Sequence, residues 1–311
     1  MGLLFHLLSG GEEGQQGFAG HVIGGMGAIT DAIAASCRDN GVDIRTGYSV
    51  KQINLLDGRA CGVTLEDDSV IEAALVVSNA DPKCTFLDLL AAGDLNDEFR
   101  HKVEGIKMAG PCGKVNFVLS EEPRVAGMPE SHSETQRSLF TLAPSLREAE
   151  DIYNRAARNE IPDKLWVDCV LASNVDPGLV TVGRHVLTCF VQYLPYSLDK
   201  SNWEVEREKV GDKVIDVIGG YAPNVPSSIV ARKVYTPFDL EQTFGITEGN
   251  IFHGDINMGQ LFFMRPVPGW SQYRTPIKGL YLCGAGAHPG GGVTGAPGYN
   301  AARRILKDKR R

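Results

Sequence analysis

The hydrophobic pattern divides the chain into three stretches, because its character changes at Leu87, holds to about Glu248 and returns to the first style from residue 279. Within the first stretch, apolar residues recur every three or four positions from residue 28 to 39. Asn40-Gly41 follows at once and supplies a left-handed stop. The pattern predicts one amphipathic helix there.

Strand-like alternation follows this helix. Four runs alternate apolar and polar residues as strands do, namely residues 42–45, 50–56, 59–65 and 69–77. Asp57-Gly58 and Asp67-Asp68 mark tight turns between them. These runs predict a β-meander, and its all-apolar end at Leu75-Val76-Val77 is typical of a strand buried on both faces of a parallel sheet.

The middle stretch mixes helical and strand patterns and predicts a separate α+β unit with a mixed sheet. Helical periodicity covers residues 95–106, 146–159 and 203–218, and strand patterns cover residues 113–119, 165–171, 185–193 and 229–235. The last stretch returns to the first style, with a strand at 280–283, a glycine-rich loop and a helix from about Pro297. The predicted fold class is therefore α/β plus α+β.

Charge and composition exclude some functions. The formal net charge of −7 argues against a nucleic-acid-binding surface, and no apolar run reaches membrane-spanning length. The basic tail at residues 303–311 could be a membrane or nucleic-acid arm, but cations at the end of a helix also complement its dipole. We interpret the tail as a solvated helix end.

The seven cysteines form no Cys-x-x-Cys pair and no Cys/His cluster with metal-ligand spacing, so we predict no metal site. Their odd number and apolar neighbours indicate reduced thiols. A reducing compartment follows, the cytoplasm or, in a eukaryote, the mitochondrial matrix.

The strongest motif is the loop from Gly284 to Gly298, which holds seven glycines in fifteen residues. A buried strand precedes the loop, and a helix capped by Thr294 or Gly295 follows it. Unpaired N–H groups at a helix start suit phosphate oxygens or the electron-rich edge of a flavin. A purely structural turn would need fewer glycines, so we favour a ligand cradle over a turn.

Four blocks resemble the phytoene dehydrogenase-like FAD-dependent oxidoreductases of the amine oxidase and phytoene desaturase superfamily. They are Gly24-Gly25-Met26-Gly27-Ala28-Ile29, Val76-Val77-Ser78-Asn79-Ala80-Asp81-Pro82, residues 260–270, and the run 280–302 with His288-Pro289-Gly290-Gly291-Gly292-Val293-Thr294-Gly295. Within that family the chain is most similar to the pyridine nucleotide-disulfide oxidoreductase domain-containing protein 2 branch.

The resemblance implies an FAD-binding domain built from N-terminal, middle and C-terminal pieces. Residues 1–86 would be the middle piece, 276–311 the C-terminal piece, and 87–275 an inserted substrate domain. We expect the dinucleotide fingerprint to lie outside this chain, since Thr30 replaces the third glycine after Gly25-Met26-Gly27. Taken alone, the chain is then expected to bind FAD weakly or not at all and to be inactive. Gly24 to Gly27 are expected to form a helix-capping loop.

Ten cofactor contacts follow from the resemblance: Val50, Asn79, Ala80, Asp81, Gly284, Ala285, Gly292, Val293, Thr294 and Ala296. Val50 would meet the adenine through its backbone, Gly284 and Ala285 would follow the pyrophosphate and ribityl chain, and the Val293 amide would face the flavin ring. Ala285 stands where wider relatives carry an acid, so it cannot hold the ribityl hydroxyls.

Four residues could line a substrate site: Phe263, Arg265, Trp270 and His288. Phe263 and Trp270 belong to an apolar cluster that fits a tunnel for a hydrophobic molecule, although ordinary core packing is the favoured interpretation. Arg265 could anchor a carboxylate or pair structurally, and His288 could donate a proton or fix its loop. The sequence assigns no catalytic residue, so the identity of the catalytic groups stays unknown.

We therefore expect an FAD-dependent oxidoreductase that transfers hydride between flavin and a hydrophobic small molecule. The alternative is a non-catalytic interaction or regulatory protein that keeps the flavoprotein fold. The sequence leaves open whether the protein is an oligomer.

Overall fold

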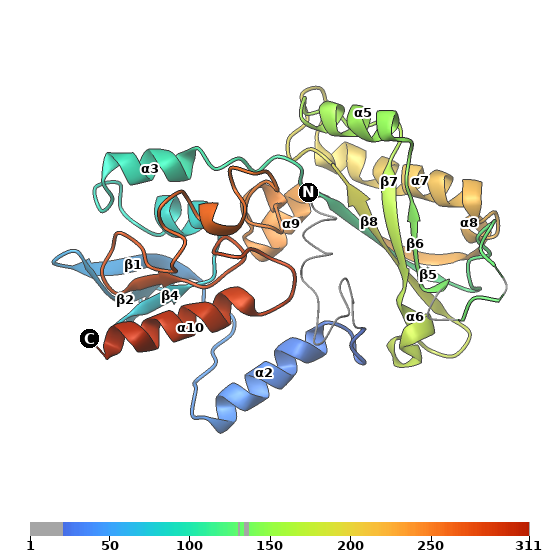
Figure 1. The fold of residues 1–311 in the computed structure, drawn as a ribbon. Helices are drawn as coiled ribbons and strands as arrows, with labels where there is room; N and C mark the ends of the chain where they lie inside the picture. The colour runs from blue at the N-terminus through green and yellow to red at the C-terminus, as the bar shows by residue number, and fades with distance from the viewer. Residues whose placement is uncertain (1–20, 130, 134–136, 311) are drawn as a thin grey trace. The chain divides into compact units, whose positions relative to one another are not determined.

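The computed structural model describes residues 21–129, 131–133 and 137–310 (Figure 1). They form two compact units, each built from two segments of the chain. Unit 1 contains residues 45–109 and 241–310, and unit 2 contains residues 21–44 and 110–240. These bounds differ from the predicted domains, because residues 87–109 and 241–275 pack with unit 1 and the early helix packs with unit 2.

Unit 1 contains the predicted meander. Strands β1 (Val50–Leu56), β2 (Arg59–Leu65) and β3 (Val70–Glu72) form an antiparallel sheet in that order. Asp57 and Gly58 both have positive φ, at 49° and 72°, as the tight turn between β1 and β2 requires. The predicted strand at 42–45 is wrong, since those residues have no regular structure and Val42 is half exposed.

The run predicted at 69–77 is two strands rather than one. Its second part, β4 (Val76–Ser78), pairs in parallel with β10 (Leu280–Leu282). Leu280 and Leu282 are buried in the core of unit 1, but Val77 is 40% exposed. The expectation that this strand is buried on both faces is therefore wrong for β4.

The remaining elements of unit 1 are short, apart from its C-terminal helix. They are the π-helical turn η1 (Cys84–Asp88), helix α3 (Asp97–Glu104), the 3₁₀ turns η3 (Thr247–Gly249) and η4 (Phe262–Met264), and helix α10 (Ala296–Lys309). Asn96 caps α3 by accepting a hydrogen bond from the Phe99 N–H at 2.8 Å. Helix α9 (Pro237–Phe244) spans the boundary between the units.

Unit 2 is built on a five-stranded antiparallel sheet with the strand order β6-β7-β8-β5-β9. Its strands are β5 (Gly113–Leu119), β6 (Leu139–Leu142), β7 (Trp166–Leu171), β8 (His185–Gln192) and β9 (Ile229–Tyr235), and its helices and turns are α2 (Gly27–Asp39), α5 (Leu146–Ala156), α6 (Ala172–Val175), η2 (Pro177–Leu179), α7 (Trp203–Tyr221) and α8 (Val225–Ser228).

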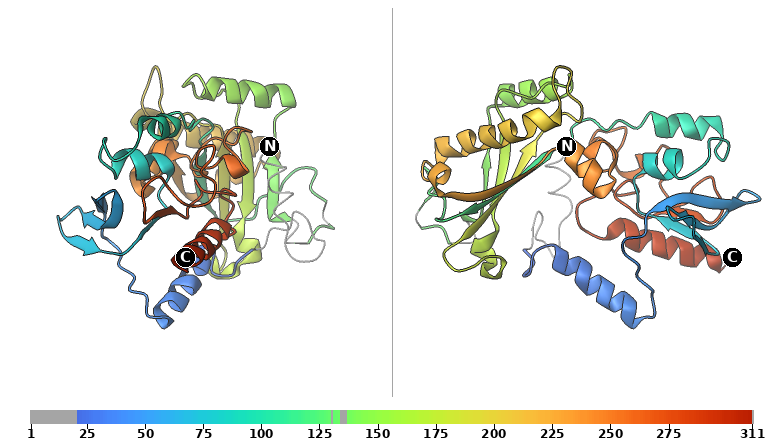
Figure 2. Two further views of the ribbon diagram at one scale, coloured as in Figure 1. Left: turned by 60° about the vertical axis from the view of Figure 1, so that its left-hand side comes forward. Right: turned by 180° about the vertical axis from the view of Figure 1, so that it is seen from behind.

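Alternation of burial along β5, β7 and β8 separates the two faces of this sheet. One face carries the apolar core of the unit and is covered by α7, whose Val210, Val214 and Ile218 pack on it (Figure 2). The predicted strands at 113–119 and 229–235 have the bounds that the structure shows. The α+β prediction for this part of the chain is confirmed.

Helix α2 has the predicted position and ends at Asn40, after which Gly41 adopts a φ of 77°. The glycines before it form a turn in which the Gly24 N–H donates to Asp176 Oδ2 at 2.5 Å. Among the described residues, no helix is both long and apolar enough to cross a membrane.

Candidate functional site

The parallel pair β4 and β10 brings two predicted site segments together. Along the chain, Asn79 and Ala80 follow β4, and Gly284 and Ala285 come shortly after β10. A Cβ on Gly284 would overlap the Asn79 backbone, with the Asn79 carbonyl carbon at only 2.9 Å. A Cβ on Gly286 would lie 2.6 Å from Pro82 Cγ. These two glycines are therefore required because one chain segment crosses closely over the other.

Asp81 fixes the β4 side of this crossing. Its carboxylate is buried and accepts four hydrogen bonds from within unit 1. Oδ1 accepts from the Lys83 and Cys84 N–H groups, and Oδ2 accepts from the N–H and hydroxyl of Thr247 at 3.0 and 2.7 Å. Asp81 thus ties β4 to a segment more than 160 residues away. Its contact with a cofactor stays a prediction.

Arg265 fixes the β10 side. Its side chain is 3% exposed and donates to the carbonyls of Gln260, Gly254, Ala285 and Phe252. Burial lowers the pKa of its guanidinium to about 10. With its donors directed at backbone oxygens, Arg265 holds the loop at Ala285 in place. Of the two roles left open by the sequence, the structural one is observed, and a place in the lining of a substrate site stays a prediction.

The second half of the glycine-rich loop is open. Gly292, Thr294 and Gly295 are exposed, and Val293 is 71% exposed. Three of the four residues from 292 to 295 have positive φ: Gly292 at 135°, Val293 at 56° and Gly295 at 67°. Thr294 Oγ1 accepts from the Ala296 N–H at 3.2 Å, so the bend leads directly into α10. The prediction that Thr294 or Gly295 begins this helix is confirmed.

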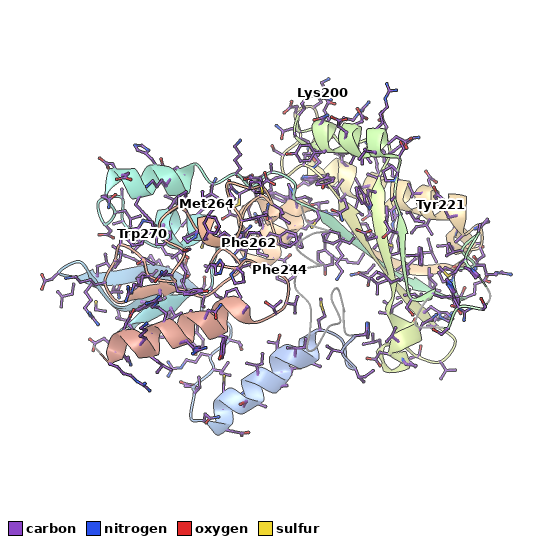
Figure 3. The ribbon with its side chains drawn as sticks, viewed as in Figure 1. Lys200, Tyr221, Phe244, Phe262, Met264 and Trp270 are labelled. Carbon is purple, nitrogen blue, oxygen red and sulfur yellow. The ribbon has the colours of Figure 1, made fainter. Side chains whose placement is uncertain are left out.

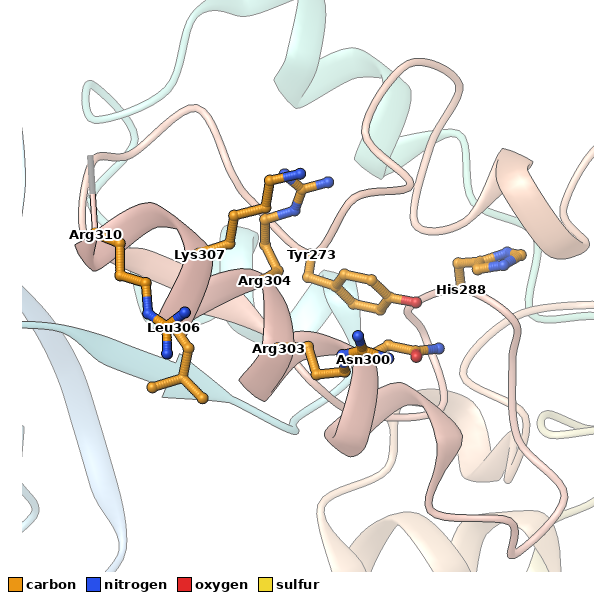
Figure 4. A pocket seen from close by; sticks show the side chains of 8 residues that line it. All are labelled: Tyr273, His288, Asn300, Arg303, Arg304, Leu306, Lys307 and Arg310. Carbon is orange, nitrogen blue, oxygen red and sulfur yellow. The ribbon is translucent and has the colours of Figure 1, made fainter.

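A pocket of about 830 Å³ lies beside α10 (Figure 4). It is lined by Tyr273, His288, Asn300, Arg303, Arg304, Leu306, Lys307 and Arg310. His288, Tyr273 and Asn300 gather at one end, and the basic side chains follow the helix toward the other. His288 Nδ1 is buried without a hydrogen-bond partner among the described residues. Of the four residues predicted to line a substrate site, His288 is the one at this pocket.

Comparisons with known proteins agree with one another. The sequence profile described as "Flavin containing amine oxidoreductase" matches residues 2–175, more than half of the chain. Pyridine nucleotide-disulfide oxidoreductase domain-containing protein 2 of Mus musculus is 39% identical over 98% of this chain and 54% of its own length. The chain belongs to the flavin-containing amine oxidoreductase family. This confirms the resemblance that the glycine-rich motif and its companion blocks predicted.

Other relatives in the flavin-containing amine oxidoreductase group are more distant. A lycopene-forming phytoene desaturase of Pseudescherichia vulneris is 26% identical, over 88% of this chain and 52% of that protein. A putrescine oxidase structure with bound putrescine superposes with a TM-score of 0.57 at 16% identity, over 92% of this chain and 53% of that one. At that identity the likeness shows the mixed α/β fold. The chain spans about half the length of the curated relatives it matches.

The fit of a flavin to these residues can be tested on Gly298. It lies in the first turn of α10 with ordinary helical geometry, where alanine would be favoured by roughly 1 kcal/mol. A Cβ there would meet no atom of the chain within 4 Å. Crowding within the described residues thus does not explain this glycine, and the bare main chain leaves room for close approach of a ligand. The open half of the loop therefore fits the family's cofactor.

The other predicted site residues are spread more widely. Val50 begins β1 and is 36% exposed, while Phe263 is 69% exposed. Trp270, labelled in Figure 3, packs edge-on against Phe99 of α3 with ring centres 5.3 Å apart. Of the two interpretations of the apolar cluster, core packing holds for Trp270.

Two residues that organise the site were missed. Asn250 is buried and donates to the Met108 carbonyl, while its Oδ1 accepts from the Phe252 and Gly254 N–H groups. Burial lowers the pKa of His253, whose Nδ1 has no partner among the described residues. Neither residue stands in a motif, so no signal in one sequence would have found them.

Proposed function

We propose that this chain supplies part of the FAD site of an oxidoreductase that transfers hydride between flavin and a hydrophobic substrate. The family supports a flavin and oxidation–reduction chemistry. The identification of the flavin as FAD, the hydride step and the substrate class belong to the proposal, as does the activity of any longer protein.

The open half of the loop carries this proposal. The main chain from Gly292 to Ala296 would lie against the cofactor, and the first turn of α10 offers N–H groups without intrahelical partners. The dipole of the helix adds a partial positive charge at that end, which favours negative charge on a neighbouring group. When bound, a flavin supplies the hydride chemistry, and the protein supplies position and shielding.

The packed residues behind this surface would keep it rigid. Arg265 fixes the Ala285 carbonyl at 2.7 Å, and Asp81 holds the segment that Gly284 and Gly286 cross. Asn79, Ala80 and Val50 remain proposed contacts of the cofactor. Because these contacts hold the loop in place before the cofactor binds, less conformational entropy of the loop would be lost on binding.

Exposed apolar side chains of unit 1 support a hydrophobic substrate. Met258 is 75% exposed, Phe263 69%, Phe244 62% and Ile251 37%. We propose that they form one apolar surface that the substrate covers, because contiguous exposed apolar surface marks a ligand or partner site. Phe252, next to Ile251, has its ring 3.5 Å from the position of a Cβ on Gly291, so this segment borders the glycine-rich loop.

A pair of glycine substitutions tests the proposal. Gly298→Ala and Gly220→Ala both place a methyl group in open space on a helix, in α10 and α7 respectively. We expect Gly298→Ala to weaken FAD binding at least about tenfold because the methyl group blocks close approach, and Gly220→Ala to leave it unchanged. Equilibrium dialysis of the full-length protein against FAD, with absorbance near 450 nm (roughly where flavins absorb) as the readout, measures both.

Equal FAD affinity in the two variants would contradict the role of the loop. Full-length protein that takes up no flavin at saturating FAD would contradict the enzyme and support the alternative, a non-catalytic interaction or regulatory protein. Both variants should be at least as stable as the parent, because neither adds a clash and alanine is favoured in a helix.

A further inference from the structure

The five-stranded sheet of unit 2 has a second face that its own apolar core does not use. Its residues alternate with the buried ones and are partly exposed: Lys114, Asn116 and Val118 on β5, Trp166, Asp168 and Val170 on β7, and Val186, Thr188, Phe190 and Gln192 on β8. On β9, Lys233 and Tyr235 share this face. We call this set of residues the open face.

The strand register arranges the open face in rows. One row runs Asp168, Phe190, Lys114, Tyr235 across β7, β8, β5 and β9, and the next runs Val170, Thr188, Asn116, Lys233. Side chains opposite each other in such rows lie about 5 Å apart at Cβ, and diagonal neighbours about 7–8 Å apart. Lys114 and Lys233 are diagonal neighbours, within reach of one small group.

These two lysines are cations without carboxylate partners. Neither makes an ion pair with any described residue, whereas Lys164, Arg207 and Arg232 of unit 2 each do. The Lys233 ammonium lies 5.5 Å from the centre of the Tyr235 ring, which faces Lys114 across the strands. Two like charges held close together favour binding of an anion between them.

Asn116, between the lysines, adds an unsatisfied acceptor. Its Oδ1 is buried and has no hydrogen-bond partner among the described residues. A buried polar atom without a partner costs roughly 1–3 kcal/mol, which a ligand carrying a donor would recover. Thr188 stands opposite Asn116 and brings a hydroxyl to the same place.

The other side of the open face is acidic but already satisfied. Asp168 accepts from Thr141 Oγ1 and from Gln192 Nε2, both at 2.7 Å. Phe190 separates Asp168 from Lys114, and the valines of β5, β7 and β8 extend the apolar surface along the strands. The face thus has a basic corner beside an apolar floor.

We propose that the open face binds an amphipathic acid, with its carboxylate at Lys114 and Lys233, a neighbouring hydroxyl on Asn116 Oδ1, and its apolar body over Phe190 and the valines. As a statement about the substrate it rests on the proposed oxidoreductase function. As a binding site it stands on the described residues of unit 2 and is measured without flavin.

Titration calorimetry with 2-hydroxydodecanoate, dodecanoate and dodecylamine below their micelle concentrations tests the site. We expect the hydroxy acid to bind about fivefold more tightly than dodecanoate, and the amine to bind most weakly. Lys114→Met should weaken both acids about tenfold or more, while Lys114→Arg should retain them. Asn116→Leu should remove the preference for the hydroxy acid and leave dodecanoate binding unchanged.

Two controls separate binding from folding. Lys209→Met removes an exposed lysine of α7 that pairs with Glu206, and it should leave acid binding unchanged. Lys114→Met should not lower the urea midpoint, because it removes a partly buried cation that has no partner. A lysine that merely stabilised the sheet would lower it.

Acid binding that is equal in Lys114→Met and the parent, or an amine that binds as tightly as the acids, would overturn the proposal. So would a parent protein that binds neither acid. If Lys114→Met keeps its flavin spectrum, a failure of acid binding counts against the open face alone and leaves the proposed function standing. If acid binding is intact but the flavin spectrum is missing, only the proposed function is overturned.

Discussion

The two halves of the glycine-rich loop use the same residue type for opposite reasons. In the first half, Gly284 and Gly286 lie against the Asn79 backbone and Pro82, where a Cβ has no room. In the second half, Gly295 and Gly298 face open space. Glycine serves packing within the chain in one half, and in the other half it leaves main chain uncovered. A count of glycines cannot tell these situations apart.

The largest effect is expected at Arg265, which supports the packed half. Arg265→Ala leaves four carbonyls without their donor in a buried place. We expect a loss of about 3–5 kcal/mol in the free energy of unfolding, measured by urea denaturation. Arg100→Ala, which removes an i,i+4 pair with Glu104 on α3, is the control and should cost less than about 1 kcal/mol. Similar losses in both would contradict the role of Arg265.

Gly284→Ala tests the crowding itself. The added methyl group meets backbone atoms of Asn79 that cannot move without disturbing the β4–β10 pair. We expect a loss of about 2–3 kcal/mol in the same measurement. Gly93→Ala is the matched control in unit 1, because a Cβ there meets nothing within 4 Å. Unchanged stability in Gly284→Ala would show that the two segments can separate freely.

A smaller effect, confined to mildly acidic solution, is expected at His253, whose Cβ packs near Gly286. Burial lowers its pKa below 6.5, the nearby Asp81 opposes this, and Arg265 adds to it. Between its folded pKa and 6.5 the unfolded state binds more protons, so stability falls as the pH drops below about 6.5.

His253→Asn should therefore lose less stability between pH 7 and pH 5 than the parent does, because asparagine does not titrate. Asparagine also tolerates the positive φ of this position. Thermal unfolding at several pH values measures this, with the exposed His101→Asn as control. Parallel pH profiles for His253→Asn and the parent would contradict it.

The smallest effects on the free energy of unfolding are expected in the open half of the glycine-rich loop, where one substitution should destabilise the protein and another should stabilise it. Gly295→Ala places a side chain at a φ of 67° and should cost about 1 kcal/mol. Gly298→Ala lies in a regular helix and should add about 0.5–1 kcal/mol. Differential scanning calorimetry distinguishes them. A clear loss of stability in Gly298→Ala would mean that this turn is crowded, and the comparison between the halves would fail.

Elements with strong local patterns were predictable from the sequence. The meander, four strands of the five-stranded sheet and the start of α10 follow from alternation, turn residues and capping, all of which act over a few residues. The strand expected at 42–45 fails because a run of four residues without a pairing partner does not form a strand. Helix α9 and strand β6 were missed because their patterns are short.

The candidate site was predictable only in part. The position of the glycine-rich loop follows from composition and from the family resemblance, and its contact with a cofactor stays a prediction. The structural role of Arg265 does not, since its four acceptors are backbone carbonyls that any sequence would supply. The unit boundaries were also missed, because residues 241–275 join unit 1 through long-range contacts such as Thr247 to Asp81.

The pairing of β4 with β10 has a consequence for the order of folding. About 200 residues separate the two strands, and unit 2 is almost entirely encoded between them. At roughly 5–20 residues per second, a ribosome needs on the order of 10–40 s to synthesise that interval. During that time β10, the strand that pairs with β4 among the described residues, has not yet been made, whereas four strands and then the fifth strand of the five-stranded sheet can already assemble. We therefore expect unit 2 to fold first on the nascent chain, with unit 1 closing only after Leu282 has left the exit tunnel.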